Sequence, residues 1–370
     1  MTRTMEMRSC KPLPGDLEIE ILSRLPVKSL LRFKCICKSW YVSIKSPRFI
    51  NKHLRLSQNS SCLLLLRARR DTYKYLATLL SSGTIGVSAE MEFPNLKSAK
   101  IIGSCNGLVS ICDYFYDYRT IHILNPATRE VIKPIPVPPY ETCQPHVSPE
   151  TTFFAFGFDP KINDYKLVRI NRLVAESGEL PSVVQICTLR SPSWRDTELV
   201  VPAHISANGQ INTYINGTFN WLARDSEGSI NTILSFHMSN EVFETTKIPD
   251  FLLKNHWGQL AVLNGSLALI RYPKRGGRPR TSMYYEIWAT NQSRLEEEEA
   301  WVRKVAVGPI AGVVETPLAI LGIDILFLAS SEGELISCDL RTQEIRKHQV
   351  FGVEQRMQVG IYNESLISVE

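Results

Sequence analysis

The strongest constraint on the fold is a strand–turn–strand pattern that recurs along residues 62–370. In one type of unit, two short apolar strands flank a polar turn. Equivalent residues of its three copies, Asn125, His237 and Asp339, lie 112 and 102 residues apart. A second type, centred on Gln185 and Glu286, alternates with the first at a spacing of 101 residues. Because the two types interleave, the repeating unit is about 50 to 56 residues long.

Tight turns add a further strand to several of these units. Asn-Gly pairs at 106–107, 216–217 and 264–265 precede apolar runs, and Asn-Gly is a strong signal for a hairpin turn. Several short strands in a unit of about 50 residues are typical of a kelch-like β-propeller. The sequence therefore predicts an all-β propeller of about six kelch-like blades, with a twisted sandwich of two sheets as the alternative. We expect the last strand, 360–368, to pair near 62–67 and close the ring.

A different pattern occupies residues 12–54, where apolar residues follow a helical period. Leu17, Ile21 and Leu25 fall on one stripe, and Pro26 ends the first helix. Two further helices and a last short turn are expected before residue 55. A segment of about 45 residues buries too little surface to be robust alone. The pattern leaves two interpretations open: a helical cap packed on the body, or a docking unit whose apolar face meets a partner.

Positive charge is concentrated in the same segment. Residues 11–55 contain ten Lys or Arg and three Asp or Glu, a net charge of +7, whereas residues 56–370 have a net charge of −3. A basic segment suits an acidic partner, and a body without a basic excess gives no support for nucleic-acid binding. The expected closed ring does not need this segment as part of its core. Charge and repeat together favour the docking unit.

The segment is also similar to a known motif. The match covers the whole motif without an insertion or deletion. The residues that carry it are Leu13, Pro14, Leu17, Ile21, Leu22, Leu25, Pro26, Leu30, Leu31, Cys35, Cys37 and Trp40. They resemble the F-box of the large plant F-box family. The resemblance implies a small all-α F-box, a three-helix hook in which these residues bind a Skp-type adaptor and, through it, cullin and RING subunits. We expect a disordered N-terminus at 1–10, the F-box at 11–55 and a linker at 56–61.

The body, expected at 62–370, resembles the plant F-box-associated domain. The phrases that carry this resemblance lie in the expected order at 103–109, 124–129, 156–168, 193–195, 216–223 and 340–344. It implies a non-catalytic substrate-recognition subunit of an SCF-type E3 ubiquitin ligase, which binds a protein target for ubiquitination and proteasomal degradation. The family includes S-locus F-box proteins, which recognise pistil ribonucleases in self-incompatible plants. The alternatives are a non-degradative scaffold bound to the adaptor and a ligand-binding propeller of another function.

The sequence lacks the signals of several other protein classes. The first ten residues have no apolar core of a signal peptide, and the apolar runs are shorter than the ~18 residues of a membrane span. Nine scattered cysteines and seven dispersed histidines form no metal-binding motif, and no glycine-rich nucleotide motif is present. We therefore expect reduced thiols, a location in the cytoplasm or nucleus, no metal or cofactor, no catalytic site, and neither a nucleic-acid nor a membrane partner.

Three stretches of unusual composition are candidates for loops. The stretch 134–150 is the longest irregular one, and long loops on a rigid scaffold often carry binding residues. It is therefore a candidate for contact with the target. The basic stretch 272–280 and the acidic run 296–299 are expected to be solvated loops of one blade.

Overall fold

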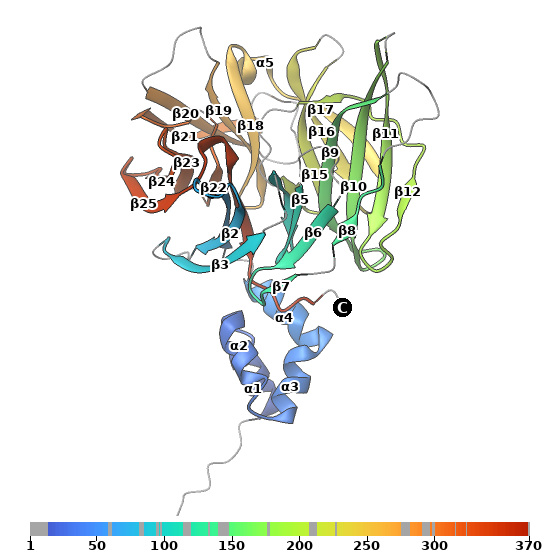
Figure 1. Cartoon of the computed structure of the whole chain (residues 1–370), viewed down its shortest axis with the longest axis vertical. Coiled ribbons are helices and arrows are strands. Elements are labelled where there is room, and N and C mark those ends of the chain that lie inside the picture. Colours follow the sequence, from blue (N-terminus) through green and yellow to red (C-terminus); the bar gives the residue numbers. More distant parts are fainter. Residues whose placement is uncertain are drawn as a thin grey trace, which may run out of the picture.

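Antiparallel hairpins build the chain after residue 60 into six sheets of four or five strands, which form the six blades of a β-propeller (Figure 1). The computed structural model describes residues 14–57, 61–80, 85–93, 96, 98–113, 120–131, 134–139, 148–175, 178–206, 213–225, 228–274, 282–290, 297, 300–314, 316–322 and 324–368. The predicted propeller of about six blades is confirmed, and the alternative of a two-sheet sandwich is excluded.

The first three blades contain the strands up to residue 196 and, in blade 1, the last strand of the chain. Blade 1 has the order β26 (Met357–Asn363), β1 (Ser61–Ala68), β2 (Tyr75–Leu80) and β3 (Val87–Phe93). Blade 2 consists of β4 (Ala99–Cys105), β5 (Leu108–Asp113), β6 (Thr120–Asn125) and β7 (Glu130–Val131), with β8 (Ile135–Pro136) also paired to β6. Blade 3 consists of β9 (Ser148–Asp159), β10 (Asp164–Ala175), β11 (Gly178–Thr188) and β12 (Trp194–Asp196).

The other three blades follow the same plan. In blade 4, β13 (His204–Ile205) and β14 (Tyr214–Ile215) both pair with β15 (Thr218–Arg224), which is followed by β16 (Ile230–His237) and β17 (Val242–Lys247). Helix α5 (Asp250–Leu253) leads to blade 5, which consists of β18 (His256–Leu263), β19 (Ser266–Pro273), β20 (Ser282–Thr290) and β21 (Trp301–Ala311). Blade 6 consists of β22 (Ala319–Leu321), β23 (Ile325–Ala329), β24 (Glu334–Asp339) and β25 (Ile345–Phe351).

The predicted tight turns connect the first and second strands of their hairpins. Both residues of each Asn-Gly pair have positive φ, which a type I′ turn requires and which Asn and Gly tolerate best. At Asn106–Gly107 the φ angles are 51° and 84°. The polar turns of the first repeat type are also closed locally, since the Asn125 side-chain oxygen accepts the backbone N–H of Ala127 at 3.0 Å.

Apolar cores lie between neighbouring blades all round the ring. The core between blades 3 and 4 contains Trp221 and Phe236, both 0% exposed. The core between blades 6 and 1 contains Leu63 and Phe327, also 0% exposed. Because each blade shares a core with both of its neighbours, all of these cores are buried only when the ring is closed.

The ends of the propeller meet in blade 1. Strand β26 pairs antiparallel with β1 in a register that runs from Ser61–Asn363 to Arg67–Met357. Gln358 joins this blade to the next, because its side chain donates to the Ala99 carbonyl at 3.0 Å and accepts the Ile101 N–H at 2.9 Å. The predicted closure is confirmed, but the strand ends at Asn363 rather than at residue 368.

The helical unit, residues 14–57, projects from one side of the ring (Figure 1). It contains α1 (Gly15–Leu22), α2 (Val27–Phe33), α3 (Lys38–Lys45) and α4 (Pro47–Ser57). The last element is a helix of 11 residues instead of the expected short turn, and it extends into the predicted linker. Among the described residues, no helix is long and apolar enough to span a membrane.

The segment that follows β26 packs against the helical unit, near α4 (Figure 1). Leu366, 3% exposed, belongs to the same core as Leu22, Val27, Leu30, Ile44 and Phe49. The Glu364 carboxylate accepts the Val27 N–H at 3.3 Å. The helical unit therefore takes part of its core from the C-terminal end of the body, which fits the expectation that a segment of this size is not robust alone.

His53 places a titratable group inside the helical unit. Its side chain is 3% exposed, and Nε2 lies 3.0 Å from the Leu25 carbonyl oxygen. Burial lowers the pKa of His53 below its ordinary value of 6.5, although the hydrogen bond to Leu25 opposes the shift. Between pH 6.5 and the lowered pKa, the unfolded state binds more protons than the folded state. The free energy of unfolding of the helical unit therefore falls as the pH falls through this range.

We therefore expect the amides of α1 to α4 to lose hydrogen-exchange protection between pH 7.5 and pH 5.5, after correction for intrinsic rates. In His53→Gln, which keeps a donor for the Leu25 carbonyl but does not titrate, most of this pH dependence should disappear. An equal loss of protection in wild type and His53→Gln would contradict the prediction. The helices are followed separately because His122 and His348 in the propeller also have lowered pKa values.

Candidate functional site

The structure divides the predicted adaptor-binding residues that it describes into three groups by their exposure. Leu22 and Leu30 are buried in the core of the helical unit, so they hold the helices together and do not offer a contact surface. Leu25, Leu31 and Trp40 are half-buried. The exposed members are Pro14, Leu17, Ile21, Pro26, Cys35 and Cys37. Leu13 lies outside the described residues.

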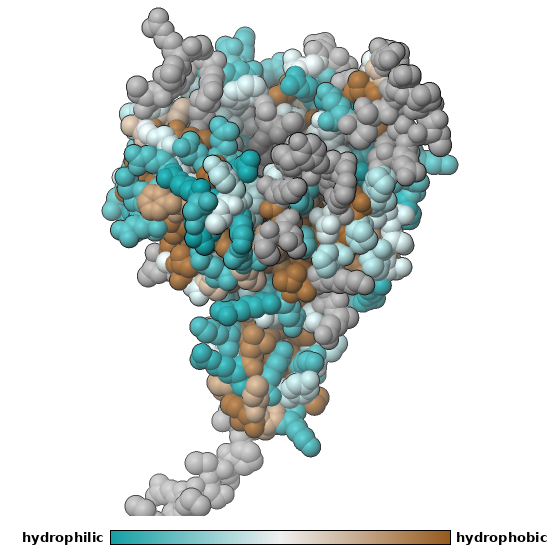
Figure 2. Space-filling model, in the orientation of Figure 1, coloured by the Kyte–Doolittle hydropathy of each residue, from teal (hydrophilic) through white to brown (hydrophobic). Residues whose placement is uncertain are grey.

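The exposed members include two large apolar side chains that follow each other on helix α1. Leu17 and Ile21 are four residues apart, one helical turn, and each is 53% exposed. Pro14 is the N-cap residue of this helix, and its carbonyl accepts the N–H groups of Leu17 and Glu18. Figure 2 shows hydrophobic side chains at the surface of the helical unit, interleaved with hydrophilic ones. Such a surface on a unit with an intact core is suited to a protein partner.

Besides Leu56 on α4, which is 39% exposed, three further apolar residues of this unit are exposed but were not in the predicted set. Ile36 and Val42 are 62% and 66% exposed, and Tyr41 is 46% exposed. Ile36 lies between α2 and α3, and the other two lie on α3. The helical period could have indicated Val42, because it falls off the stripe of the buried Ile44. These residues extend the apolar surface beyond α1.

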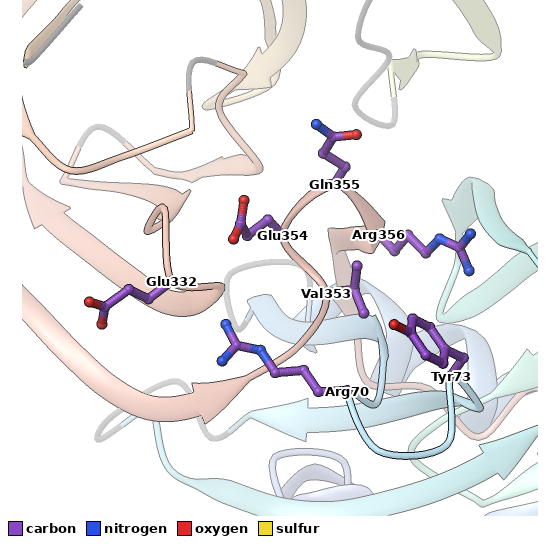
Figure 3. A pocket seen from close by; sticks show the side chains of 7 residues that line it. All are labelled: Arg70, Tyr73, Glu332, Val353, Glu354, Gln355 and Arg356. Carbon is purple, nitrogen blue, oxygen red and sulfur yellow. The ribbon is translucent and has the colours of Figure 1, made fainter. Parts of the chain in front are cut away.

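A second candidate site is a pocket of about 650 Å³ where blades 1 and 6 meet (Figure 3). Its lining comes from the β1–β2 hairpin, the β23–β24 turn and the segment between β25 and β26: Arg70, Tyr73, Glu332, Val353, Glu354, Gln355 and Arg356. The pocket lies at the opposite end of β1 from α4, since β1 begins at Ser61 after that helix and ends at Ala68. Eight strand residues span roughly 25 Å.

The three segments around the pocket are cross-linked by hydrogen bonds. The Val353 N–H donates to the Ala68 carbonyl at 3.0 Å, and the Gly352 N–H donates to the Gly333 carbonyl at 2.9 Å. Arg70 Nε donates to the Gly352 carbonyl at 3.2 Å. Gly333 has φ +68°, and a Cβ there would lie 2.2 Å from the Gly352 oxygen, so glycine is required for this close approach.

The predicted loops are in part strands, because 135–136 form β8, 148–150 begin β9 and 272–273 end β19. Residues 140–147 of the expected target loop lie outside the described residues, as do 275–280 of the basic stretch and all of the acidic run except Glu297. Lys274, which directly follows β19 within the basic stretch, lies 5.3 Å from the centre of the Trp257 ring. The residues that the structure describes contain no group of three or more His, Cys, Asp or Glu arranged to hold a metal ion.

Comparisons with known proteins identify both parts of the chain. Residues 12–52 match the F-box domain family, and residues 62–358 match the family described as F-box associated beta propeller domain. The F-box/kelch-repeat protein At3g23880 of Arabidopsis thaliana is 29% identical over 284 residues, which cover 73% of this chain and 75% of that protein. F-box protein CPR1 of Arabidopsis thaliana is 25% identical over 321 residues, 80% of this chain and 73% of that protein. Since the two matches together span most of its length, the chain belongs to the plant F-box proteins with an F-box-associated β-propeller domain.

Proposed function

We propose that this chain is the substrate-recognition subunit of an SCF-type E3 ubiquitin ligase. The F-box, here the helical unit, docks a Skp-type adaptor and through it the cullin and RING subunits. The propeller binds a protein target for ubiquitination and proteasomal degradation. The chain performs no chemistry of its own and instead holds the target close to the ubiquitin-transferring subunits in a suitable orientation. Such positioning can lower much of the free-energy barrier of a bimolecular reaction. It acts in the cytoplasm, the nucleus or both.

The observation that carries this proposal is the exposed apolar pair Leu17 and Ile21 on an F-box whose core is complete without them. An F-box that served only as a cap would bury this face against the propeller. The basic excess of residues 11–55 supports an acidic adaptor, because opposite charges speed encounter and favour the correct partner.

We expect the double variant Leu17→Asp, Ile21→Asp to lose adaptor binding by about a hundredfold or more. Each anchor contributes roughly 1.5 to 3 kcal/mol when it is buried at an interface, and a carboxylate in its place must be desolvated. The measurement is the dissociation constant of the full-length chain with purified Skp-type adaptor. Both side chains are half exposed in the free chain, so the thermal stability of the variant should stay close to wild type.

Val200→Asp is the matched control, since Val200 is 78% exposed on the propeller and its substitution should leave adaptor binding unchanged. Equal binding by wild type and the F-box variant would show that the site is wrong. An adaptor complex that binds a target but does not transfer ubiquitin to it, with assembled cullin and RING subunits, would favour the scaffold. A pistil ribonuclease, which the resemblance to S-locus F-box proteins suggests, can be tested as a target in the same assembled complex.

A further inference from the structure

We propose that the pocket between blades 1 and 6 binds a target peptide that carries both a basic and an anionic side chain. This inference rests on the proposed function and names the chemistry of the target. The pocket lies at the opposite end of β1 from the F-box helices, so a bound target would not compete with the adaptor for the same surface. Its volume of about 650 Å³ is within the usual range of ligand pockets, about 300 to 1,000 Å³.

Within the part of the chain that the structure describes, the four charged side chains of the pocket have no ion-pair partner. They are Arg70, Arg356, Glu332 and Glu354. Other basic residues of the same hairpin region do pair: Arg67 with Glu90, Arg69 with Asp71 and Lys74 with Glu92. The contrast is local, because Arg69 and Arg70 are neighbours in the chain. Because Arg70 already donates to the Gly352 carbonyl and is directed toward the two glutamates, Arg356 and a net charge of −1 from Glu332, Glu354 and Arg70 are available to a ligand.

The pocket separates these charges into two regions. In Figure 3, Glu332 and Glu354 lie on one side with the Arg70 guanidinium directed toward them, and Arg356 lies with Tyr73 on the other side. Arg356 is 6.0 Å from the centre of the Tyr73 ring, a distance at which a cation interacts with an aromatic face. One region therefore suits a basic side chain, and the other suits an anionic group beside an aromatic ring.

The lining favours a peptide over an apolar small molecule. Pockets for small molecules are lined mainly by hydrophobic side chains, whereas among the described lining residues of this pocket Val353 is the only aliphatic one. Hydrogen bonds between the three segments order the backbone that carries these side chains before binding, so less ordering of the backbone is needed. Complementary charges also give specificity for one sequence over another. The occupant that fits is a segment with Lys or Arg for Glu332 and Glu354, and a carboxylate or phosphate for Arg356.

The test is a selection from displayed random peptides of about twelve residues, using the full-length chain bound to its Skp-type adaptor. We expect the selected peptides to share a basic and an acidic residue at a constant spacing. Their affinity should fall at least tenfold in Arg356→Glu and in the double variant Glu332→Lys, Glu354→Lys. Selection with the double variant should lose the basic residue. A phosphoserine analogue of the best peptide then compares phosphate with carboxylate.

Arg224→Glu, an exposed charge reversal at the end of β15 in blade 4, is the matched control and should bind the peptides as wild type does. Selected peptides without the paired charges, or equal affinity in the pocket variants and the control, would overturn the pocket proposal. Adaptor binding is measured in the same preparations. If it is intact while the charge dependence is absent, the pocket assignment fails and the proposed function stands; if adaptor binding is absent, the proposed function fails.

Discussion

Removal of residues 364–370 is expected to destabilise the F-box by about 2 to 5 kcal/mol while the six blades stay folded. Leu366 is 3% exposed in the F-box core, and the loss of a buried leucine side chain costs about this much. The truncation also removes the Glu364 carboxylate that accepts the Val27 N–H. Strand β26 ends at Asn363, so the closing strand of blade 1 is retained. Hydrogen exchange of the amides in α1 to α4, compared with those of the blades, measures the effect.

The same truncation should also loosen the F-box from the propeller. Asn125 of blade 2 donates to the Ser365 carbonyl at 3.0 Å and to the Ile367 carbonyl at 2.9 Å, which fixes the C-terminal segment to the propeller while Leu366 enters the F-box. We expect faster proteolysis between Ser57 and Ser61 and weaker adaptor binding. Removal of residues 369–370 alone is the control and should change neither. Unchanged protection of the F-box amides after the longer truncation would show that the contact does not contribute.

The sequence predicted those features that depend on local pattern. The spacing of Asn125, His237 and Asp339 indicated the blade period, because each residue ends the third strand of its blade. Asn-Gly pairs indicated tight turns because few other residues adopt two successive positive φ angles. The apolar stripe on α1 indicated a helix. None of these signals requires knowledge of which distant segment lies alongside.

The features that the sequence did not predict depend on contacts between distant segments. The hydrogen bond from the Val27 N–H to the Glu364 carboxylate joins residues that are 337 positions apart in the sequence. Residues 366–367 are apolar like much of β26, so the sequence predicted that this strand continues through them. The resemblance to the F-box placed Leu17 and Leu22 in one adaptor-binding set, although Leu22 is buried and Leu17 is exposed. No sequence pattern marks the pocket, because its residues come from three connections between strands and their polar residues carry no periodic signal.

Substitution of Lys166 by methionine is expected to destabilise the propeller by about 3 to 5 kcal/mol. Lys166, with a side chain 5% exposed, joins blades 3 and 4: its Nζ lies 2.6 Å from Asp159 Oδ2 and 2.7 Å from Glu241 Oε1. Removing one partner of a buried pair leaves the other charge desolvated and unpaired, which costs about this much. Lys161→Met is the matched control, because Lys161 lies in the turn just after Asp159 and is exposed. Denaturant unfolding at pH 7 measures both variants.

The size of this effect should depend on pH. Burial raises the pKa of Asp159, but hydrogen bonds from Lys166, the Lys161 N–H and Ser239 outweigh it, so the pKa lies below its ordinary value of 3.8. Because the pKa is lower in the folded state, ionised Asp159 stabilises the fold at pH values above the pKa of the unfolded state. This contribution is lost as the pH falls through the pKa of the folded state. The difference between wild type and Lys166→Met should therefore shrink in strong acid. At pH 7, adding Asp159→Asn to Lys166→Met should restore part of the stability, because the uncompensated charge is then removed. A double variant no more stable than Lys166→Met would mean that lost packing, rather than the buried carboxylate, explains the destabilisation.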